Sequence, residues 1–156
     1  MIFVFLPAYN EEEALPKLIS KLDQEFKNIG QSYRTVVLDD GSQDGTKKVA
    51  RDLSVRYTLT LIEHSLNQGL GPTMVDGLKH VSSQAAPGDA IVTLDCDDAH
   101  EPKYIGKALD KMKEGYDLVI LSRYQAGGGE RGLSFIKSVL SRGAGFFLKI
   151  FFRSTG

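Results

Sequence analysis

Residues 34–46, which read RTVVLDDGSQDGT, decide the fold. The apolar run 34–38 predicts a buried strand. Turn-forming residues follow it, and Asp44 is placed to cap a helix that opens at Gly45 and Thr46. A buried strand that passes through a short polar turn into a helix is the repeating unit of an α/β domain.

The same unit recurs along the whole chain. Apolar runs predict further strands at 2–6, 58–63, 90–94 and 117–121. Spacing and start signals predict helices at 13–29, 71–83, 102–113 and 134–152. This alternation indicates a three-layer α/β/α domain with a mostly parallel central sheet. Ligands bind outside the carboxyl ends of the strands in such sheets, so the residues directly after each strand are the functional candidates.

Composition narrows the class of protein. With 156 residues, 42% of them hydrophobic and 25% charged, the chain suits one soluble globular domain. The net charge of −1 argues against a nucleic-acid partner. The single cysteine, Cys96, excludes an internal disulfide and a cysteine-based zinc site. We expect no signal peptide and no membrane-spanning helix, because no apolar stretch is long enough.

The last segment of the chain has a distinct charge. After Glu130 there are no acidic residues, whereas five cations and many apolar side chains alternate there. Such a segment can lie at an anionic membrane interface. Two other interpretations stay open: an ordinary core helix with basic solvent-facing positions, or a surface that docks on further chain.

The pair Asp95 and Asp97 follows the predicted strand 90–94. Two neighbouring carboxylates repel each other unless a cation lies between them. Hard oxygen ligands suit Mg²⁺ or Mn²⁺, and Mg²⁺ commonly takes one or two carboxylates together with substrate phosphates. The alternative is a loop of solvated aspartates. Cys96 between them is more simply a small buried spacer than a nucleophile, because nothing nearby favours a thiolate.

Polar residues also follow the first two strands. Asp39 could accept a hydrogen bond from a base or a ribose hydroxyl, whereas Asp40 stays open between ligand contact and loop structure. Tyr9 could stack on a nucleobase or simply pack over the sheet edge. Glu11 could contact a ligand or serve as a first-turn acid favoured by the helix dipole. The isolated histidines His64 and His80 are predicted to be structural or exposed, so they carry no assigned chemistry.

Five segments in the same order resemble the nucleotide-binding half of family 2 glycosyltransferases with a GT-A, Rossmann-like fold. They are PAYNEE, VVLDDGSQDGT, NQGLGPTMVDG, LDCDDAHEP and LSRYQAGGGERG. The last of these, with the later LSRGAG stretch, makes the chain most similar to dolichol- or polyprenyl-phosphate mannosyltransferases. The resemblance implies a single domain over 1–156, with a nucleotide-sugar-binding part at 1–125 and the start of an acceptor-side region at 126–156.

The resemblance assigns roles to residues of the nucleotide-binding part. Pro7, Tyr9 and Glu11 match the nucleoside-contacting start of the domain. Asp39 matches the acid that binds the base or ribose. Asp95 and Asp97 match the pair that binds the metal ion, Mg²⁺ or Mn²⁺, and the diphosphate, and Asp97 is also expected to be catalytic.

Basic residues later in the chain match the phosphate-binding side. Arg123 matches a basic residue near the donor phosphates, and Lys137 and Ser141 fall where the family places an Arg and a Ser near the acceptor phosphate. Arg123 and Lys137 are therefore expected to be catalytic. Lys137 keeps the charge of the usual Arg but loses its planar bidentate fork. Cys96 stands where the family usually has Ala. Because family members continue beyond the residue that matches Gly156, we expect a fold that is incomplete at its C-terminal end.

The implied activity is transfer of a hexose, mannose or glucose, from GDP-mannose or UDP-glucose to a polyprenyl or dolichyl phosphate. The transfer inverts the anomeric carbon and depends on the metal. The implied location is cytoplasmic, peripheral at the cytoplasmic face of a membrane, in cell-envelope or glycan biosynthesis. Two alternatives stay open: a hydroxyl-directed transferase of polysaccharide or glycolipid synthesis, and a non-catalytic nucleotide-sugar-binding module. A receiver-type signalling domain would explain Asp39 and Asp40 but not the Asp95–Asp97 pair.

Overall fold

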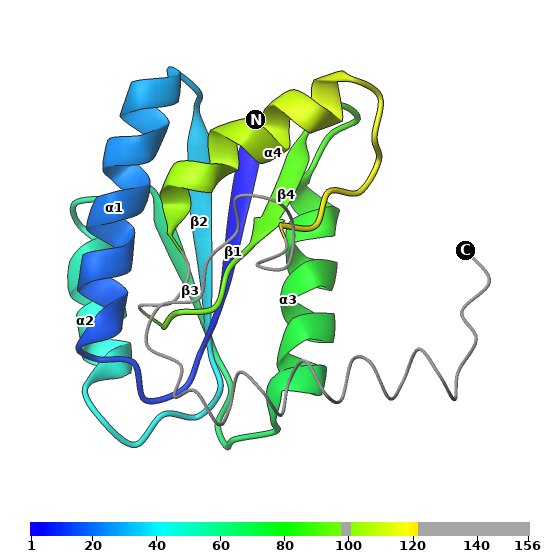
Figure 1. The fold of residues 1–156 in the computed structure, drawn as a ribbon. Helices are drawn as coiled ribbons and strands as arrows, with labels where there is room; N and C mark the ends of the chain where they lie inside the picture. Colours follow the sequence, from blue (N-terminus) through cyan, green and yellow to red (C-terminus); the bar gives the residue numbers. More distant parts are fainter. Residues whose placement is uncertain (98–100, 122–156) are drawn as a thin grey trace, which may run out of the picture. The chain divides into compact units, whose positions relative to one another are not determined.

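The computed structural model describes residues 1–97 and 101–121, and residues 1–120 form one compact unit. Four parallel strands form one sheet in the order β3-β2-β1-β4 (Figure 1). The strands are β1 (Ile2–Ala8), β2 (Tyr33–Asp39), β3 (Leu59–Glu63) and β4 (Ala90–Thr93). The helices are α1 (Ala14–Ile29), α2 (Thr46–Ser54), α3 (Leu70–Gln84) and α4 (Ile105–Lys113), and a short 3₁₀ turn over Pro102–Tyr104 leads into α4. The predicted α/β class with a parallel sheet is confirmed.

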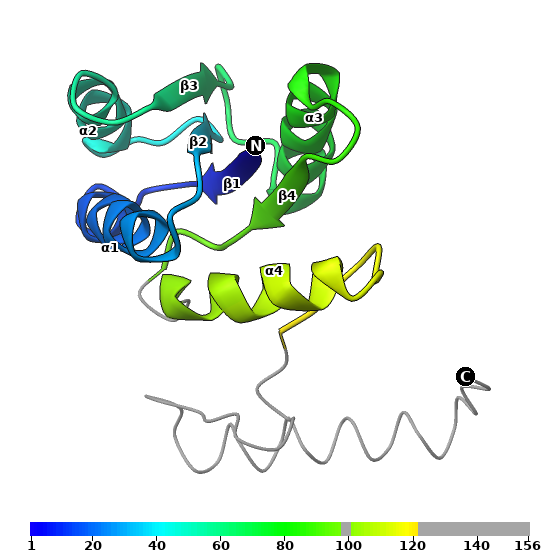
Figure 2. The same ribbon diagram turned by 90° about the horizontal axis from the view of Figure 1, so that it is seen from above.

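Helices cover both faces of the sheet. Figure 2 shows α1 and α2 on one face and α3 on the other. Strand β1 is buried along its whole length, and successive side chains point to opposite faces. Val4 and Leu6 belong to the core beneath α1, α2 and α4, whereas Phe3 and Phe5 belong to the core beneath α3. The sheet thus has a hydrophobic core on each face, which explains why β1 is apolar along its whole length and does not alternate with polar residues.

The contact between α3 and the sheet depends on a glycine. A Cβ added to Gly77 would lie 2.0 Å from Cζ of Phe5, a fully buried side chain. Two carbon atoms cannot approach so closely. The absence of a side chain at Gly77 therefore allows α3 to pack directly on the ring of Phe5.

The strands end level with one another at the edge that carries the polar residues. The register pairs Ala8 of β1 with Asp39 of β2, and Asp39 with Glu63 of β3. Glu63 forms an ion pair of 2.7 Å with Arg51 of α2. The loops that follow β1, β2 and β3 consequently begin side by side, as expected at the carboxyl edge of a parallel sheet.

The predicted strand at 117–121 was wrong for the described structure. These residues form no strand, and the side chains of Leu118 and Ile120 are 76% and 77% exposed. An apolar run indicates side chains that are stabilised by burial. A strand also requires a neighbouring strand that forms hydrogen bonds with its backbone, and the run does not report whether one is present. The predicted helix 134–152 lies outside the described residues. Within the described residues, every helix is too short or too polar to cross a membrane.

Candidate functional site

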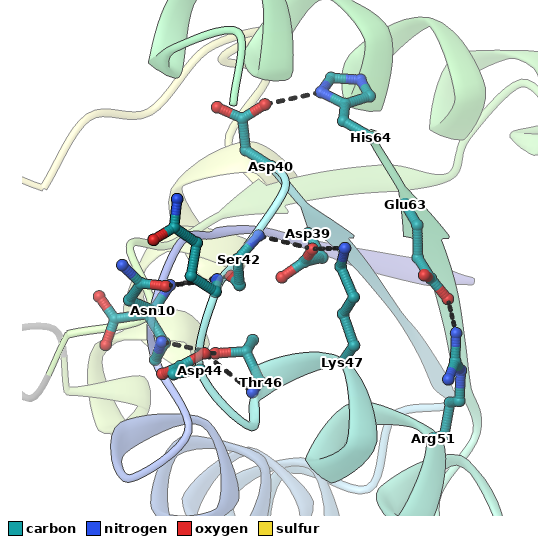
Figure 3. A network of polar contacts seen from close by, with 12 residues as sticks. Asn10, Asp39, Asp40, Ser42, Asp44, Thr46, Lys47, Arg51, Glu63 and His64 are labelled. Carbon is teal, nitrogen blue, oxygen red and sulfur yellow. Dashed lines mark hydrogen bonds and ion pairs between the residues drawn. The ribbon is translucent and has the colours of Figure 1, made fainter. Parts of the chain in front are cut away.

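The two adjacent aspartates at the end of β2, Asp39 within the strand and Asp40 directly after it, point to opposite sides of the sheet. Asp39 faces α2 and Asp40 faces α3, as Figure 3 shows. Successive residues of a strand alternate in this way. Both carboxylates are buried, with 0% and 4% of their surface exposed. The two carboxylates therefore have different neighbours, and their roles differ accordingly.

Asp39 has one satisfied and one unsatisfied oxygen. Its Oδ2 accepts the backbone N–H of Ser42 at 3.1 Å and lies 3.6 Å from Nζ of Lys47. Its Oδ1 is buried and has no hydrogen-bond partner among the described residues. A buried acceptor without a donor costs about 1–3 kcal/mol. Such an atom fits a ligand that brings an N–H or O–H group.

Asp40, by contrast, has partners on both oxygens. Oδ1 lies 2.8 Å from Nδ1 of His64 and accepts the backbone N–H of Gln68 at 2.9 Å, and Oδ2 accepts that of Gly69 at 2.8 Å. Burial opposes the charge, but the hydrogen bonds from His64, Gln68, Gly69 and Thr73 together hold the pKa of Asp40 below its usual value. Of the two roles left open for Asp40, these bonds support the structural one, in which Asp40 holds the loop that includes Gln68 and Gly69. His64 is the side chain that bonds it.

The loop after β1 is bonded to the loop after β2 (Figure 3). Asn10 has a positive φ of 58°, a left-handed conformation that Asn tolerates better than most residues. This turn lets its backbone N–H donate to Oγ of Ser42 at 2.9 Å, while its side-chain Oδ1 accepts the N–H of Gln43 at 2.9 Å. The two bonds run in opposite directions and hold the first part of each loop against the other.

The next residues continue the same attachment. The backbone N–H of Glu11 donates to Oγ1 of Thr46 at 2.7 Å, and that of Glu12 donates to Oδ2 of Asp44 at 3.2 Å. In return, Oε2 of Glu12 accepts the N–H of Gly45 at 2.6 Å. The sequence pattern had offered Glu11 as a ligand contact or a first-turn acid, and the structure places its backbone in this attachment. Glu12 serves the loop rather than the helix that follows it.

Asp44 was predicted to be the N-cap of α2, and this was wrong by one residue. Gly45 occupies the N-cap position. Asp44 still accepts the N–H of Thr46, the first helical residue, at 2.9 Å. Burial opposes its charge, but hydrogen bonds from Thr46 and Glu12 hold the pKa of Asp44 below its usual value. The same carboxylate thus serves the helix start and the neighbouring loop.

Residues 94–97 after β4 alternate between buried and exposed. Leu94 and Cys96 are 8% and 3% exposed and belong to the core beneath α1, whereas Asp95 and Asp97 are exposed. Burial first, and then the negative charges of Glu11, Asp95 and Asp97, raise the pKa of Cys96 to about 12. The thiol therefore stays neutral, and the predicted role of Cys96 as a small buried spacer is confirmed by its burial.

Some of the remaining predicted site residues lie in the part of the chain that the structure describes, and others lie outside it. Pro7 is buried within β1, whereas the Tyr9 side chain is 41% exposed. A depression of about 360 Å³ lies along residues 10–14 and is also lined by Lys17 and Asp44. Arg123, Lys137 and Ser141 lie outside the described residues, as does Asp98. The structure thus brings Tyr9, Glu11 and Asp39 to one edge of the sheet and leaves the predicted acceptor side undescribed.

Comparison with known proteins assigns this arrangement to a family. The family described as glycosyl transferase family 2 matches residues 3–154. The chain belongs to glycosyl transferase family 2. The match extends over nearly the whole chain, so the family 2 assignment does not depend on any single motif.

Two curated relatives share substantial identity with this family 2 chain. The dolichol-phosphate mannosyltransferase of Pyrococcus furiosus is 36% identical over 143 residues, which cover 92% of the chain and 39% of the relative. The undecaprenyl-phosphate 4-deoxy-4-formamido-L-arabinose transferase of Aeromonas hydrophila is 32% identical over 123 residues, which cover 76% of the chain and 36% of the relative. The chain thus spans well under half the length of these two relatives.

Solved structures support the GT-A fold of the family 2 chain. S. aureus TarS aligns with a TM-score of 0.60 and 23% identity over 86% of this chain and 23% of that one. TarS residues 1–349 in complex with UDP-GlcNAc align with a TM-score of 0.55 and 22% identity over 72% of this chain and 31% of that one. At this level of identity the similarity concerns the fold alone.

The carboxylates of Asp95 and Asp97 are the possible metal ligands in the segment after β4. Among residues 1–97 and 101–121, no group of three or more His, Cys, Asp or Glu side chains could hold a metal. Mg²⁺, however, usually keeps several waters and takes only one or two carboxylates plus substrate phosphates. Asp95 and Asp97, both exposed on either side of a buried residue, fit this open type of site.

Proposed function

We propose that this chain binds the nucleotide diphosphate sugar of a glycosyltransferase that transfers a hexose to a polyprenyl phosphate. One observation carries the proposal: in a family 2 chain, Asp95 and Asp97 are both exposed in the segment that follows β4, two and four residues after its last residue. The names of both relatives specify lipid phosphates, dolichol-phosphate and undecaprenyl-phosphate. That choice of acceptor is our inference for the present chain.

Asp39 is proposed to receive the nucleoside. Its Oδ1 lacks a donor among the described residues, whereas its Oδ2 already accepts the N–H of Ser42 and forms an ion pair with Lys47. A base N–H or a ribose hydroxyl would relieve the unsatisfied acceptor. Tyr9, half exposed at the end of β1, would pack on the base. The nucleotides considered are GDP and UDP, with mannose or glucose as the sugar.

Asp95 and Asp97 are proposed to hold Mg²⁺ or Mn²⁺ and, through it, the diphosphate. When bound, the metal would neutralise the charge that develops on the leaving diphosphate. Cys96 between them keeps both in place by anchoring the segment in the core, since its own side chain is 3% exposed.

The acceptor side is proposed from residues beyond the described part. A lipid phosphate is already an anion near neutral pH, so it can attack the anomeric carbon without a general base, and the transfer inverts that carbon. Arg123 would face the donor phosphates, and Lys137 and Ser141 the acceptor phosphate. The basic and apolar segment after Glu130 would hold the enzyme at the cytoplasmic face of a membrane.

A binding experiment tests the donor half of the proposal. GDP-mannose and UDP-glucose are titrated into the chain by calorimetry, with and without Mn²⁺. We expect one of them to bind in a Mn²⁺-dependent way, and Asp97→Ala to weaken this binding by about tenfold or more, because a charge-assisted contact contributes about 1.5–3 kcal/mol. Asp52→Ala is the matched control, since Asp52 is an exposed aspartate in the last turn of α2. Equal loss in both variants, or none in either, would contradict the metal site.

A transfer experiment tests the acceptor half. Radiolabelled donor is incubated with polyprenyl phosphate in detergent and, in parallel, with an oligosaccharide. Label on the lipid phosphate supports the proposal. Label on the oligosaccharide would indicate a hydroxyl-directed enzyme, and nucleotide binding with no transfer to either acceptor would indicate a non-catalytic module.

A further inference from the structure

His64 lies between two carboxylates. Its side chain is 10% exposed and follows directly after β3. Nδ1 is 2.8 Å from Oδ1 of Asp40, and Nε2 is 3.5 Å from Oδ2 of Asp76 on α3. Its backbone N–H donates to the carbonyl oxygen of Asp39 at 2.8 Å. The residue therefore joins the end of β2 to α3 through its backbone and both of its ring nitrogens.

Asp40 is hydrogen-bonded to the two residues that lead into α3. The N-cap residue of α3, Gly69, has no side chain that could bond the first turn. The carboxylate of Asp40 instead accepts the N–H groups of Gln68 and Gly69 from across the sheet edge. A negative charge at a helix N-terminus also interacts favourably with the helix dipole. The ring of His64 holds this carboxylate in the position that both amides require.

The loop of residues 64–69 packs on the backbone next to Asp39. A Cβ added to Gly41 would lie 2.5 Å from both the amide nitrogen of Asn67 and the carbonyl carbon of Leu66, and the φ of Gly41 is +70°. Gly41 in turn precedes Ser42, whose N–H donates to Asp39. A shift of the 64–69 loop would therefore displace the turn that orients the Asp39 carboxylate.

We propose that His64 is a positioning residue for the nucleotide site, which it controls by holding Asp40 and the 64–69 loop against Gly41. The proposal rests on the proposed function in one respect: Asp39 must contact the nucleotide. His64 itself touches no ligand in this scheme. Its effect passes through the donated hydrogen bond from Nδ1 to Asp40, so a side chain with an N–H at the same place should replace it.

Three variants test this role. His64→Leu fills the space without a donor, and His64→Asn places an amide N–H near the position of Nδ1. His80→Leu is the matched control, because His80 is a histidine of α3 whose ring contacts Gln84 at the surface. The readouts are the Kd for GDP and for UDP with Mn²⁺, and the hydrogen-exchange rates of the amides of Gln68 and Gly69.

We expect His64→Leu to weaken nucleotide binding by about tenfold, as for the loss of a hydrogen bond to a charged group. It should also speed exchange at the amides of Gln68 and Gly69. His64→Asn should restore most of both properties, and His80→Leu should change neither.

If His64→Asn binds as weakly as His64→Leu, or if neither variant alters binding, the positioning role is overturned while the proposed function stands. If the wild-type chain binds neither nucleotide, the proposed function fails and the positioning role fails with it. Faster exchange in His64→Leu would then show only that His64 stabilises the start of α3.

Discussion

The hydroxyl of Thr46 accepts the backbone N–H of Glu11 at 2.7 Å, so the first residue of α2 fixes the loop that follows β1. The same hydroxyl donates to Oδ1 of Asp44. Thr46 is completely buried, so its hydroxyl has no water to bond in place of these two partners. The position of the Glu11 backbone is thus set by the first residue of α2.

The first prediction concerns that hydroxyl. Thr46→Val keeps the shape of the side chain but leaves the N–H of Glu11 without its acceptor and the carboxylate of Asp44 without one donor. We expect the free energy of unfolding, measured with urea, to fall by about 1–3 kcal/mol. Thr60→Val is the control: Thr60 lies in β3 with an exposed side chain, and its substitution should change that free energy by less than about 0.5 kcal/mol. Similar values for both variants would contradict the role of Thr46.

Much of the fold could be predicted because the signals are local. Apolar runs gave the four strands β1 to β4, and Pro102 correctly marked the start of the turn that leads into α4. The run 117–121 failed because the pattern reports what the side chains require and says nothing about a partner strand. Exposed Leu118 and Ile120 show that this requirement is unmet among the described residues.

The site was predictable in its positions but not in its contacts. Strand alternation alone would separate Asp39 from Asp40, since neighbouring residues face opposite sides of a sheet. It could not show that Asp40 bonds the residues that lead into a helix about thirty positions later, because those bonds depend on how α3 packs across the sheet. His64 was missed for the same reason. Its signal was its place directly after β3, level with the end of β2.

The second prediction concerns the packing of α3. Gly77→Ala would push a methyl group into Phe5, so it should lower the free energy of unfolding by about 1–3 kcal/mol through overpacking. Gly71→Ala in the same helix is the matched control, because a Cβ there meets no atom within 4 Å. Gly71 precedes Pro72, and a proline disfavours the helical conformation of a preceding residue that has a Cβ, so we expect little or no gain from this control. Gly77→Ala should therefore lower the thermal unfolding midpoint clearly more than Gly71→Ala does, and equal shifts would contradict this packing.

The third prediction concerns acid. Despite burial, hydrogen bonds hold the pKa of Asp40 below its ordinary value of 3.8, so the folded state releases this proton more readily than the unfolded state does. The resulting stability is present above pH 3.8 and is lost as the pH falls through the folded-state pKa. Asp40→Asn should be less stable near neutral pH and should lose less stability on acidification.

Unfolding curves in urea across the acid range would measure this difference, with Asp52→Asn as the exposed control. The free energies of unfolding of Asp40→Asn and wild type should approach each other as the pH falls below 3.8. A constant gap between the two proteins would show that the carboxylate of Asp40 keeps its ordinary pKa in the folded state.

The fourth prediction concerns Cys96, the single cysteine of the chain. Burial, and then the charges of Glu11, Asp95 and Asp97, raise its pKa to about 12 from an ordinary value of 9.0. The native thiol should therefore react far more slowly with iodoacetamide at mildly alkaline pH than the same thiol in guanidinium, because the thiolate is the reacting form. Since the folded-state pKa is raised, the neutral thiol costs the folded chain no stability below pH 9.0, and the free energy of unfolding declines as the pH rises from 9.0 toward 12.

Cys96→Ala should lack that decline, and this difference separates the thiol from tyrosines and lysines that titrate in the same range. Rapid labelling of the folded chain would mean that the segment between Asp95 and Asp97 opens to solvent. That result would contradict the proposal that the buried side chain of Cys96 holds the two aspartates in place.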